Sequence, residues 1–318
     1  MTLGERPHLR LAPEIGERTI TRLTLVDVKI SAAVRASLEA WGDAVVCREG
    51  DITAPGFLAD CFPSDRAEPV AVFHLASIVS SGAEADFDLA MKVNLDAMRE
   101  VLELCRHRDG VRRMVFASSV ATFGGHAMTP AVSDRTKQIP QSTYGMTKVM
   151  GELLINDYAR KGFVDGRAAR LPTVFVRPGK PNLAASSFAS GVIREPLHGQ
   201  ICELPVARSL KMPLLSYAKI VENLILLVEA DGDRLGDDRA VNLPSTTYSV
   251  QQQIEALERV AAKRGIKLGP IKDVPNAAIQ TLVGGWPEAT EWDRAAALGM
   301  TGDTSLDEVI ERFIDDYL

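Results

Sequence analysis

The sequence alternates short apolar runs with longer segments in which apolar residues recur every three or four positions. The short runs predict buried strands, and the longer segments predict helices with one apolar face. Strands are expected at 22–28, 43–47, 70–76, 111–119 and 169–179, and helices between them at 31–42, 85–107 and 142–161. This regular alternation predicts an α/β fold with a doubly wound parallel sheet.

The pattern changes after Gly179. Small polar residues occupy 182–191, and three helical segments follow at 216–230, 249–263 and 305–318. We therefore expect two parts: residues 1–179 form the sheet domain, and residues 180–318 form mainly a smaller mixed α/β lobe. Some segments of the second part are expected to return to the first domain.

Composition narrows the classes of partner. The chain has 318 residues and a net charge of −6, which argues against nucleic acid because phosphate contacts need clustered cations. No apolar run approaches the roughly 20 residues of a membrane span. The four cysteines are widely spaced and predict reduced thiols in a cytoplasmic protein, and no histidine or cysteine spacing predicts a metal site.

The stretch STYGMTKVMGELL (142–154) opens the helix expected at 142–161. Tyr144 and Lys148 are four residues apart, so their side chains share one helical face. A free phenol has a pKa near 10 and must fall by about 3 units to act as a base at neutral pH, which is about 4 kcal/mol of phenolate stabilisation. A nearby cation supplies part of this. The pair alone is a weak motif, because such spacings also occur by chance.

Hydroxyl and acidic residues stand where predicted strands end. Asp27, Ser118 and Ser119 follow apolar runs, and the carboxyl ends of parallel strands converge on one crevice. A serine there could hold a substrate hydroxyl beside the phenol. The alternatives are turn formation by the serines and helix capping by Asp27.

FASSVATFGG (116–125), YGMTK (144–148) and RPG (177–179) occur in this order. Together they resemble the extended short-chain dehydrogenase/reductase superfamily of NAD-dependent epimerases, dehydratases and dehydrogenases. The resemblance implies a Rossmann-like dinucleotide-binding domain at 1–179. It also implies that Tyr144 is the general base, that Lys148 binds the nicotinamide ribose and lowers the tyrosine pKa, and that Ser119 orients the substrate.

The same resemblance implies NAD as the cofactor. Asp27 would bind the adenosine ribose hydroxyls, which favours NAD over NADP, and Pro178 would contact the nicotinamide amide. Asn94 would support the site from the long helix at 85–107. The further cofactor-binding residues implied by the resemblance are Tyr144, Lys148, Asp51, Ile52, Leu75, Ala76, Ser77 and Ser118.

Longer stretches resemble one group within the superfamily, the D-erythronate dehydrogenases. They are HLASIVSSGAEADFDLAMKVNLD (74–96), ARLPTVFVRPGKPN (169–182) and AASSFASGVIREPLHG (184–199). Members oxidise C2 of a four-carbon sugar acid to a 2-keto acid with NAD. The implied substrate-binding residues are Ser119, Ser186, Ser187 and Arg194, although Arg194 on a solvated helix face is the alternative.

The N-terminus departs from this pattern. The family begins with a strand and a glycine-rich turn, followed about 20 residues later by an acidic residue. With Asp27 as that residue, the turn belongs in the first few positions, where MTLGERPHLRLAPEIGERTI holds only Gly4 and Gly16. We therefore expect the first strand and turn to be missing or altered: the chain begins late, another segment fills the gap, or tight cofactor binding is lost.

Three functions remain open at this point. The first is a small sugar-acid dehydrogenase, the second a nucleotide-sugar epimerase or dehydratase, and the third a non-catalytic regulatory protein of the same fold. Proteins of this resemblance commonly pair through the helices at 85–107 and 142–161, which predicts a homodimer.

Overall fold

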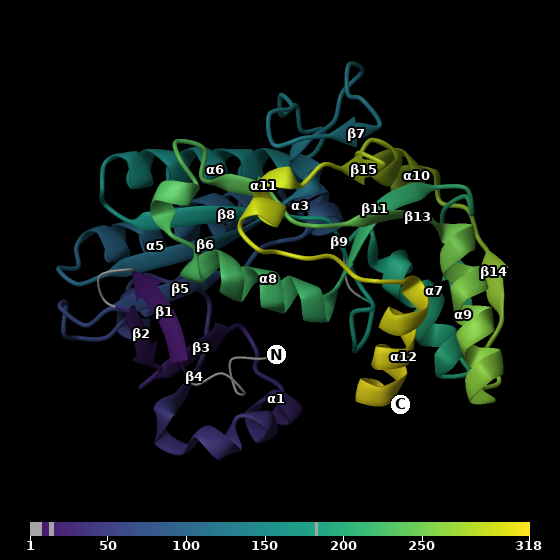
Figure 1. Cartoon of the computed structure of the whole chain (residues 1–318), viewed down its shortest axis with the longest axis horizontal. Helices are drawn as coiled ribbons and strands as arrows, with labels where there is room; N and C mark the ends of the chain where they lie inside the picture. Colours follow the sequence, from purple (N-terminus) through teal and green to yellow (C-terminus); the bar gives the residue numbers. More distant parts are fainter. Residues whose placement is uncertain (1–7, 13–15, 182–183) are drawn as a thin grey trace.

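The computed structural model describes residues 8–12, 16–181 and 184–318 (Figure 1). Its centre is a four-stranded sheet in the order β12–β8–β6–β5, with every neighbouring pair parallel. The bounds of these strands are β5 (Val70–His74), β6 (Arg112–Ser119), β8 (Asp165–Leu171) and β12 (Ala240–Asn242). The predicted α/β fold with a parallel sheet is confirmed.

Helices cover both faces of this sheet (Figure 1). On one face lie α5 (Ala97–Arg106) and α6 (Thr143–Arg160), whose apolar residues share a core with β6 and β8. On the other face lies α8 (Tyr217–Glu229), packed through Leu224 and Val228. Because both faces are covered, β6 is buried along most of its length, as in other doubly wound sheets.

The sequence predicted one strand at 169–179, and this prediction is wrong because the segment forms two strands. β8 ends at Leu171, and β9 (Thr173–Phe175) belongs to a second sheet of order β13–β11–β9. Pro172 lies between them, and proline lacks the N–H that a ladder hydrogen bond needs. The other strands of the second sheet are β11 (Lys211–Ser216) and β13 (Thr246–Ser249).

A separate apolar core lies beneath the second sheet. It is enclosed by α7 (Ser187–Leu197), α9 (Val250–Arg264) and α12 (Leu306–Tyr317). None of the helices in the described ranges is long and apolar enough to cross a bilayer. Two short parallel strand pairs complete the structure: β10 (Cys202–Leu204) with β14 (Ile271–Asp273), and β7 (Ala131–Val132) with β15 (Ala289–Thr290). The remaining short helices here are α10 (Ala277–Gly284) and α11 (Asp293–Ala297).

The long helix expected at 85–107 is interrupted. Asp86 has extended backbone angles (φ −141°) and accepts a hydrogen bond from the Leu89 N–H, so it ends α3 (Ser80–Ala85) and caps α4 (Phe87–Met91). A π-helical turn, η2 (Lys92–Asp96), then joins α4 to α5. Such turns often occur at functional sites, and this one carries Asn94.

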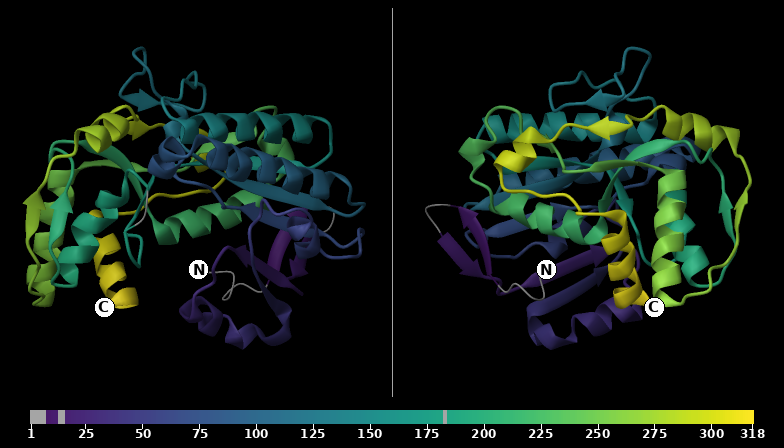
Figure 2. Two further views of the ribbon diagram at one scale, coloured as in Figure 1. Left: turned by 180° about the vertical axis from the view of Figure 1, so that it is seen from behind. Right: turned by 45° about the vertical axis from the view of Figure 1, so that its right-hand side comes forward.

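The N-terminal strands form their own parallel pair, β3 (Leu23–Asp27) with β4 (Val45–Glu49). In the described ranges, β3 and β5 share no hydrogen-bond ladder, and Figure 2 shows the purple pair set apart from the four-stranded sheet. A hairpin, β1 (His8–Ala12) and β2 (Gly16–Thr19), lies against α8. The first seven positions, where the sequence placed the glycine turn, lie outside the described residues.

Short elements connect this pair. The helix expected at 31–42 is shorter, because α1 (Ala32–Ser37) gives way to η1 (Glu39–Ala44), in which Gly42 has φ 53°. α2 (Phe57–Cys61) follows β4, and its Leu58 joins the core beneath α5. Asp27 and Glu49 are register partners at the carboxyl ends of β3 and β4.

Candidate active site

Ser119 ends β6 and begins a short 3₁₀ turn, η3 (Val120–Thr122). Its Oγ accepts a hydrogen bond from the Ala121 N–H at 3.1 Å, so the turn fixes the direction of this hydroxyl. Ser118 points to the opposite face of the strand. There it is buried and donates to Glu152 Oε1, away from the crevice.

The start of α6 brings Tyr144 to Ser119. Ser142 caps the helix by accepting a hydrogen bond from the Gly145 N–H at 3.1 Å. A Cβ at Gly145 would lie 2.1 Å from the Ala121 carbonyl oxygen, so only glycine allows this close approach of helix and turn. The predicted meeting of a strand end with the start of this helix is present.

Burial and polar neighbours act in opposite directions on the phenol. Burial raises the pKa of Tyr144, whereas a hydrogen bond with the Ser119 hydroxyl and the positive charge of Arg177 lower it. The sequence assigned the cation's role to Lys148. That role of Lys148 stays a prediction, and the positive charge of Arg177 also acts on the phenol.

Lys148 lies one helical turn beyond Tyr144 and is only 2% exposed. Its Nζ is 4.8 Å from the centroid of the Phe116 ring and 5.3 Å from that of the Tyr144 ring. Burial lowers the pKa of Lys148 from 10.5 to about 7, and the Glu152 carboxylate opposes this fall. The free protein therefore holds a lysine that titrates near neutrality.

This burial predicts that Lys148→Met stabilises the free protein while removing a residue of the site. Because the folded pKa is lowered, the unfolded chain binds the proton more tightly between pH 7 and 10.5. The gain in the free energy of unfolding of Lys148→Met over the wild type is fully present below pH 7 and vanishes as the pH approaches 10.5. At about 1.36 kcal/mol per pKa unit, this gain is at most about 5 kcal/mol. Urea unfolding of both proteins across this pH range measures it.

Lys161→Met, at the exposed end of the same helix, is the matched control and should leave stability within about 0.5 kcal/mol at every pH. A Lys148→Met protein less stable than the wild type at pH 6 would contradict the account, because it would mean that the ammonium is well solvated or paired.

Asn94 joins three segments around the site. Its Oδ1 accepts hydrogen bonds from the Ile78 N–H at 2.7 Å and the Ser77 hydroxyl at 3.1 Å. Its Nδ2 donates to the Ile78 carbonyl and to Thr147 Oγ1 on α6. The side chain is 2% exposed and its hydrogen-bonding groups are all used by these partners, so it holds the loop after β5 against α6.

Most of the predicted cofactor residues stand at or just after the carboxyl ends of strands. Asp27 ends β3 and is exposed, and Asp51 lies just beyond β4, where hydrogen bonds from Thr53 lower its pKa. Leu75 and Ala76 follow β5 and are exposed, and Pro178 lies beyond β9, also exposed. Ile52 is instead buried in the core.

The residue types suit NAD at two points. An exposed carboxylate at a strand end, as at Asp27, accepts hydrogen bonds of the kind that adenosine ribose hydroxyls donate, and an ammonium such as that of Lys148 donates to hydroxyl oxygens. The pyrophosphate needs a turn of free backbone N–H groups at a helix start. Before Gly42, the described residues contain no glycine with positive φ that would form such a turn.

The predicted substrate residues lie on and before α7. Ser186 and Ser187 are partly exposed at the helix start, and the loop before them is tied to α3 by a 2.9 Å hydrogen bond from the Ala185 N–H to Ser80 Oγ. Arg194 lies deeper and is 6% exposed. Its Nη1 donates to the Arg177 carbonyl at 2.8 Å, and its Nη2 pairs with Glu195 at 2.5 Å. The exposed, solvated setting considered as an alternative for Arg194 is therefore wrong.

Arg177 was missed by the sequence analysis. It is half-buried just beyond β9, and its charge lowers the pKa of Tyr144. A cation directly after the apolar run TVFV, at a strand's carboxyl end, was the available signal.

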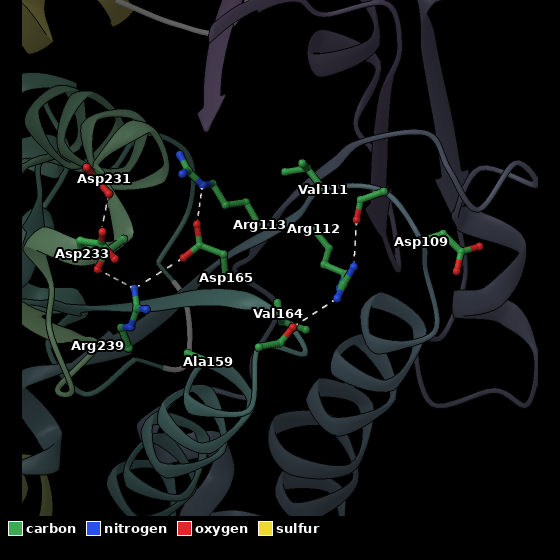
Figure 3. Close-up of a pocket in the computed structure, with 13 residues that line it drawn as sticks. Asp109, Val111, Arg112, Arg113, Ala159, Val164, Asp165, Asp231, Asp233 and Arg239 are labelled. Atoms are coloured by element: carbon green, nitrogen blue, oxygen red, sulfur yellow. Dashed lines mark hydrogen bonds and ion pairs between the residues drawn. The ribbon is translucent and has the colours of Figure 1, made fainter. Parts of the chain in front are cut away.

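A cavity of about 720 Å³ lies at the opposite, amino end of the sheet (Figure 3). Charged side chains that line this cavity already have partners within the protein: Arg112 donates to the Phe163 carbonyl, and Arg113 pairs with Asp165 at 2.8 Å. Within the described ranges, no group of three or more metal-ligating side chains gathers. Ser119, the hydrogen-bond partner of Tyr144, lies at the other, carboxyl end of β6.

A family model described as the NAD dependent epimerase/dehydratase family matches residues 12–235. The chain belongs to this family, and its cofactor is NAD. The superfamily resemblance of the sequence is confirmed.

Two curated relatives are similar to this chain over most of its length. The D-erythronate dehydrogenase of Cupriavidus necator is 47% identical over 93% of this chain and 88% of that protein. The D-erythronate dehydrogenase of Haemophilus influenzae is 44% identical over 78% of each chain. Together with the family, they confirm the predicted class of enzyme, an NAD-dependent dehydrogenase.

Solved structures agree on the fold. A nucleoside-diphosphate-sugar epimerase from Agrobacterium tumefaciens superposes with a TM-score of 0.80 and 37% identity, over 94% of this chain and 86% of that one. An L-threonine 3-dehydrogenase from Trypanosoma brucei superposes with a TM-score of 0.78 over 92% and 96%. At 22% identity, the second supports the fold alone.

Proposed function

We propose that this protein oxidises C2 of a four-carbon sugar acid such as D-erythronate to the 2-keto acid, with NAD. The observation that carries the proposal is the convergence of Ser119, Tyr144 and Lys148 at one strand end. The likeness to two D-erythronate dehydrogenases supports the choice of substrate.

The proposed roles follow from the contacts. Ser119 holds the C2 hydroxyl next to the phenol, and Tyr144 removes the hydroxyl proton as the C2–H bond breaks. NAD, when bound, takes the hydride, so the substrate loses two electrons and becomes a ketone. Lys148 orients the nicotinamide ribose. Asp27, Asp51, Leu75, Ala76 and Pro178 are the proposed cofactor contacts that reach the surface.

Four further predicted cofactor contacts, among them Asn94, are partly or wholly buried. Ser118 and Ile52 are buried, and Ser77 bonds to Asn94. We propose that Ser118, Ile52 and Asn94 shape the cofactor crevice from behind it. Ser186 and Ser187 are the proposed hydroxyl partners of the substrate, because they begin α7 beside α3.

The direct test is purified protein with NAD and a panel of four-carbon sugar acids, followed by the absorbance of the reduced cofactor. We expect turnover of D-erythronate and slower turnover of its diastereomer. Reduction of NAD by none of the acids would overturn the proposal.

The second candidate is a nucleotide-sugar epimerase. The specific observation in its favour is the 37% identity to a nucleoside-diphosphate-sugar epimerase of known structure. The serine, tyrosine and lysine serve both reactions, so the panel should include nucleotide sugars. Conversion of a nucleotide sugar without net NAD reduction would favour the epimerase.

The third candidate is a non-catalytic protein of the same fold. It is favoured by the separation of β3–β4 from β5, because the phosphate-binding turn of this fold sits at that junction. Binding of a sugar acid without turnover, at any NAD concentration, would favour it over both enzymes.

We also propose a cytoplasmic homodimer that pairs through α4, α5 and α6. All four cysteines are free thiols, which suits a reducing compartment. On the outer side of the helices, Leu153 is 62% exposed, Phe87 54% and Leu89 41%. Large apolar side chains grouped on adjacent helices mark an interaction surface.

Leu153→Glu should therefore break the dimer. A charge at the centre of an apolar contact is left without a partner and is costly to bury. Light scattering should give about twice 34.5 kDa for the wild type and a single chain for the variant at micromolar concentration.

Ile201→Glu replaces another exposed residue, 52% exposed and distant from these helices, and serves as the control that should remain dimeric. A wild type that elutes as a single chain, or a Leu153→Glu protein that remains a dimer, would refute this arrangement.

A further inference from the structure

The short helix α3 contacts two segments of the candidate site. At its start, Ser80 Oγ accepts a hydrogen bond from the Ala185 N–H at 2.9 Å, one residue before the serines proposed to bind the substrate. Near its end, Glu84 Oε1 accepts a hydrogen bond from the Thr143 N–H at 2.7 Å, one residue before Tyr144. α3 therefore lies against both the substrate segment and the start of α6.

The Thr143 N–H needs an acceptor from outside its own helix. The first N–H groups of a helix have no partner within the helix, and the capping side chain of Ser142 is already used by the Gly145 N–H. Glu84 supplies the acceptor from 59 residues earlier in the chain. A carboxylate also suits the positive end of a helix. The contact therefore fixes where the first turn of α6 lies relative to α3.

The place of this first turn decides where the phenol lies, because Tyr144 directly follows Thr143. The turn after β6 limits the helix at one point, since a Cβ at Gly145 would lie 2.1 Å from the Ala121 carbonyl oxygen. The bond to Glu84 limits it at a second point. A general base must lie within hydrogen-bond reach of the proton that it removes, and a displacement of about 1 Å can cost about 100-fold in rate.

We propose that Glu84 is a positioning residue for the base, an inference that rests on the proposed function. Through the Thr143 N–H it holds the start of α6, so that the Tyr144 hydroxyl stays beside Ser119. Glu84 itself is exposed, and without it water can bond to the Thr143 N–H. Its replacement therefore leaves a folded protein whose first helical turn is less constrained.

The kinetic test compares Glu84→Ala with Glu84→Gln. We expect Glu84→Ala to lower kcat for D-erythronate about tenfold, the effect of one hydrogen bond to a charged acceptor, with KM for the acid within about twofold. Glu84→Gln keeps an acceptor oxygen and should hold kcat within about threefold of the wild type. The pH at which kcat falls by half should be the same in Glu84→Gln and the wild type, because the residue acts through the backbone.

Glu258→Ala is the matched control, since it removes an exposed carboxylate from α9 and should leave kcat unchanged. A Glu84→Ala enzyme with the kcat of the wild type would overturn the inference. So would a Glu84→Gln enzyme as slow as Glu84→Ala, because the lost charge, and not the lost acceptor, would then be the cause.

Residue-resolved amide exchange of the free protein separates this inference from the proposed function. The Thr143 amide should exchange about tenfold faster or more in Glu84→Ala, and at the rate of the wild type in Glu258→Ala. If the wild type oxidises no sugar acid but this exchange is faster, the proposed function fails and the anchoring by Glu84 stands. If the exchange is unchanged while the wild type oxidises D-erythronate, the anchoring fails and the function stands.

Discussion

Tyr144→Phe should lower kcat for D-erythronate by 10²- to 10⁴-fold, the range that loss of a general base produces. The substitution removes only the hydroxyl, so the packing of α6 on the turn after β6 is kept. The free protein should still bind NAD within threefold of the wild type, because Lys148 and Asp27 are unchanged. Steady-state kinetics and calorimetry measure the two effects.

Tyr158→Phe is the matched control. It makes the same change on the same helix, where the hydroxyl donates to Glu103 at the far end from the crevice. Its kcat should remain within twofold of the wild type. A Tyr144→Phe enzyme that keeps more than a tenth of its activity would exclude the phenol as the base.

Glu152→Ala should destabilise the protein by about 3–5 kcal/mol, the cost of leaving one partner of a buried ion pair alone. Glu152 is 2% exposed and accepts hydrogen bonds from Arg170 Nε at 3.0 Å and Nη2 at 2.8 Å. Ser118 and Gln138 also donate to it. Removing the carboxylate leaves Arg170 with Asp134, whose Oδ1 is 3.7 Å away. Urea unfolding at pH 7 measures the loss.

The double variant Glu152→Met, Arg170→Met is the control for this pair. Replacing both charges with apolar side chains removes the unpaired cation, so it should recover most of the stability that Glu152→Ala loses. A loss below about 1 kcal/mol for Glu152→Ala would mean that water reaches Arg170.

The order of strands and helices was readable from the sequence because buried parallel strands are continuous apolar runs. The meeting of Ser119 and Tyr144 followed from the same architecture, since strand ends converge at one edge. The capping residue Ser142 was readable too, and the structure confirms its role for α6.

Other features depend on tertiary contacts. The pairing of Arg194 with Glu195 could not be read from spacing, because adjacent residues on a helix point in different directions and meet only when packing turns them together. The extended backbone at Asp86 breaks a segment whose apolar periodicity is uninterrupted. By contrast, the end of β8 before Pro172 was readable and was missed.

The place of Arg177 also depends on tertiary contacts. Its place depends on Ser190 and Arg194, which are 13 and 17 residues away in the chain and reach it only when α7 packs on β9. Sequence alone could note a cation at a strand end, but the contacts that fix its place form only in the folded molecule.

Transfer of isotope from C2 tests the central claim most directly. The protein is incubated with NAD and D-erythronate carrying deuterium at C2, and the reduced cofactor is analysed by mass spectrometry. The account predicts one deuterium in each reduced cofactor and a 2-keto acid as product. Reduced cofactor without deuterium would mean that another carbon is oxidised, and no reduced cofactor at all would contradict the dehydrogenase.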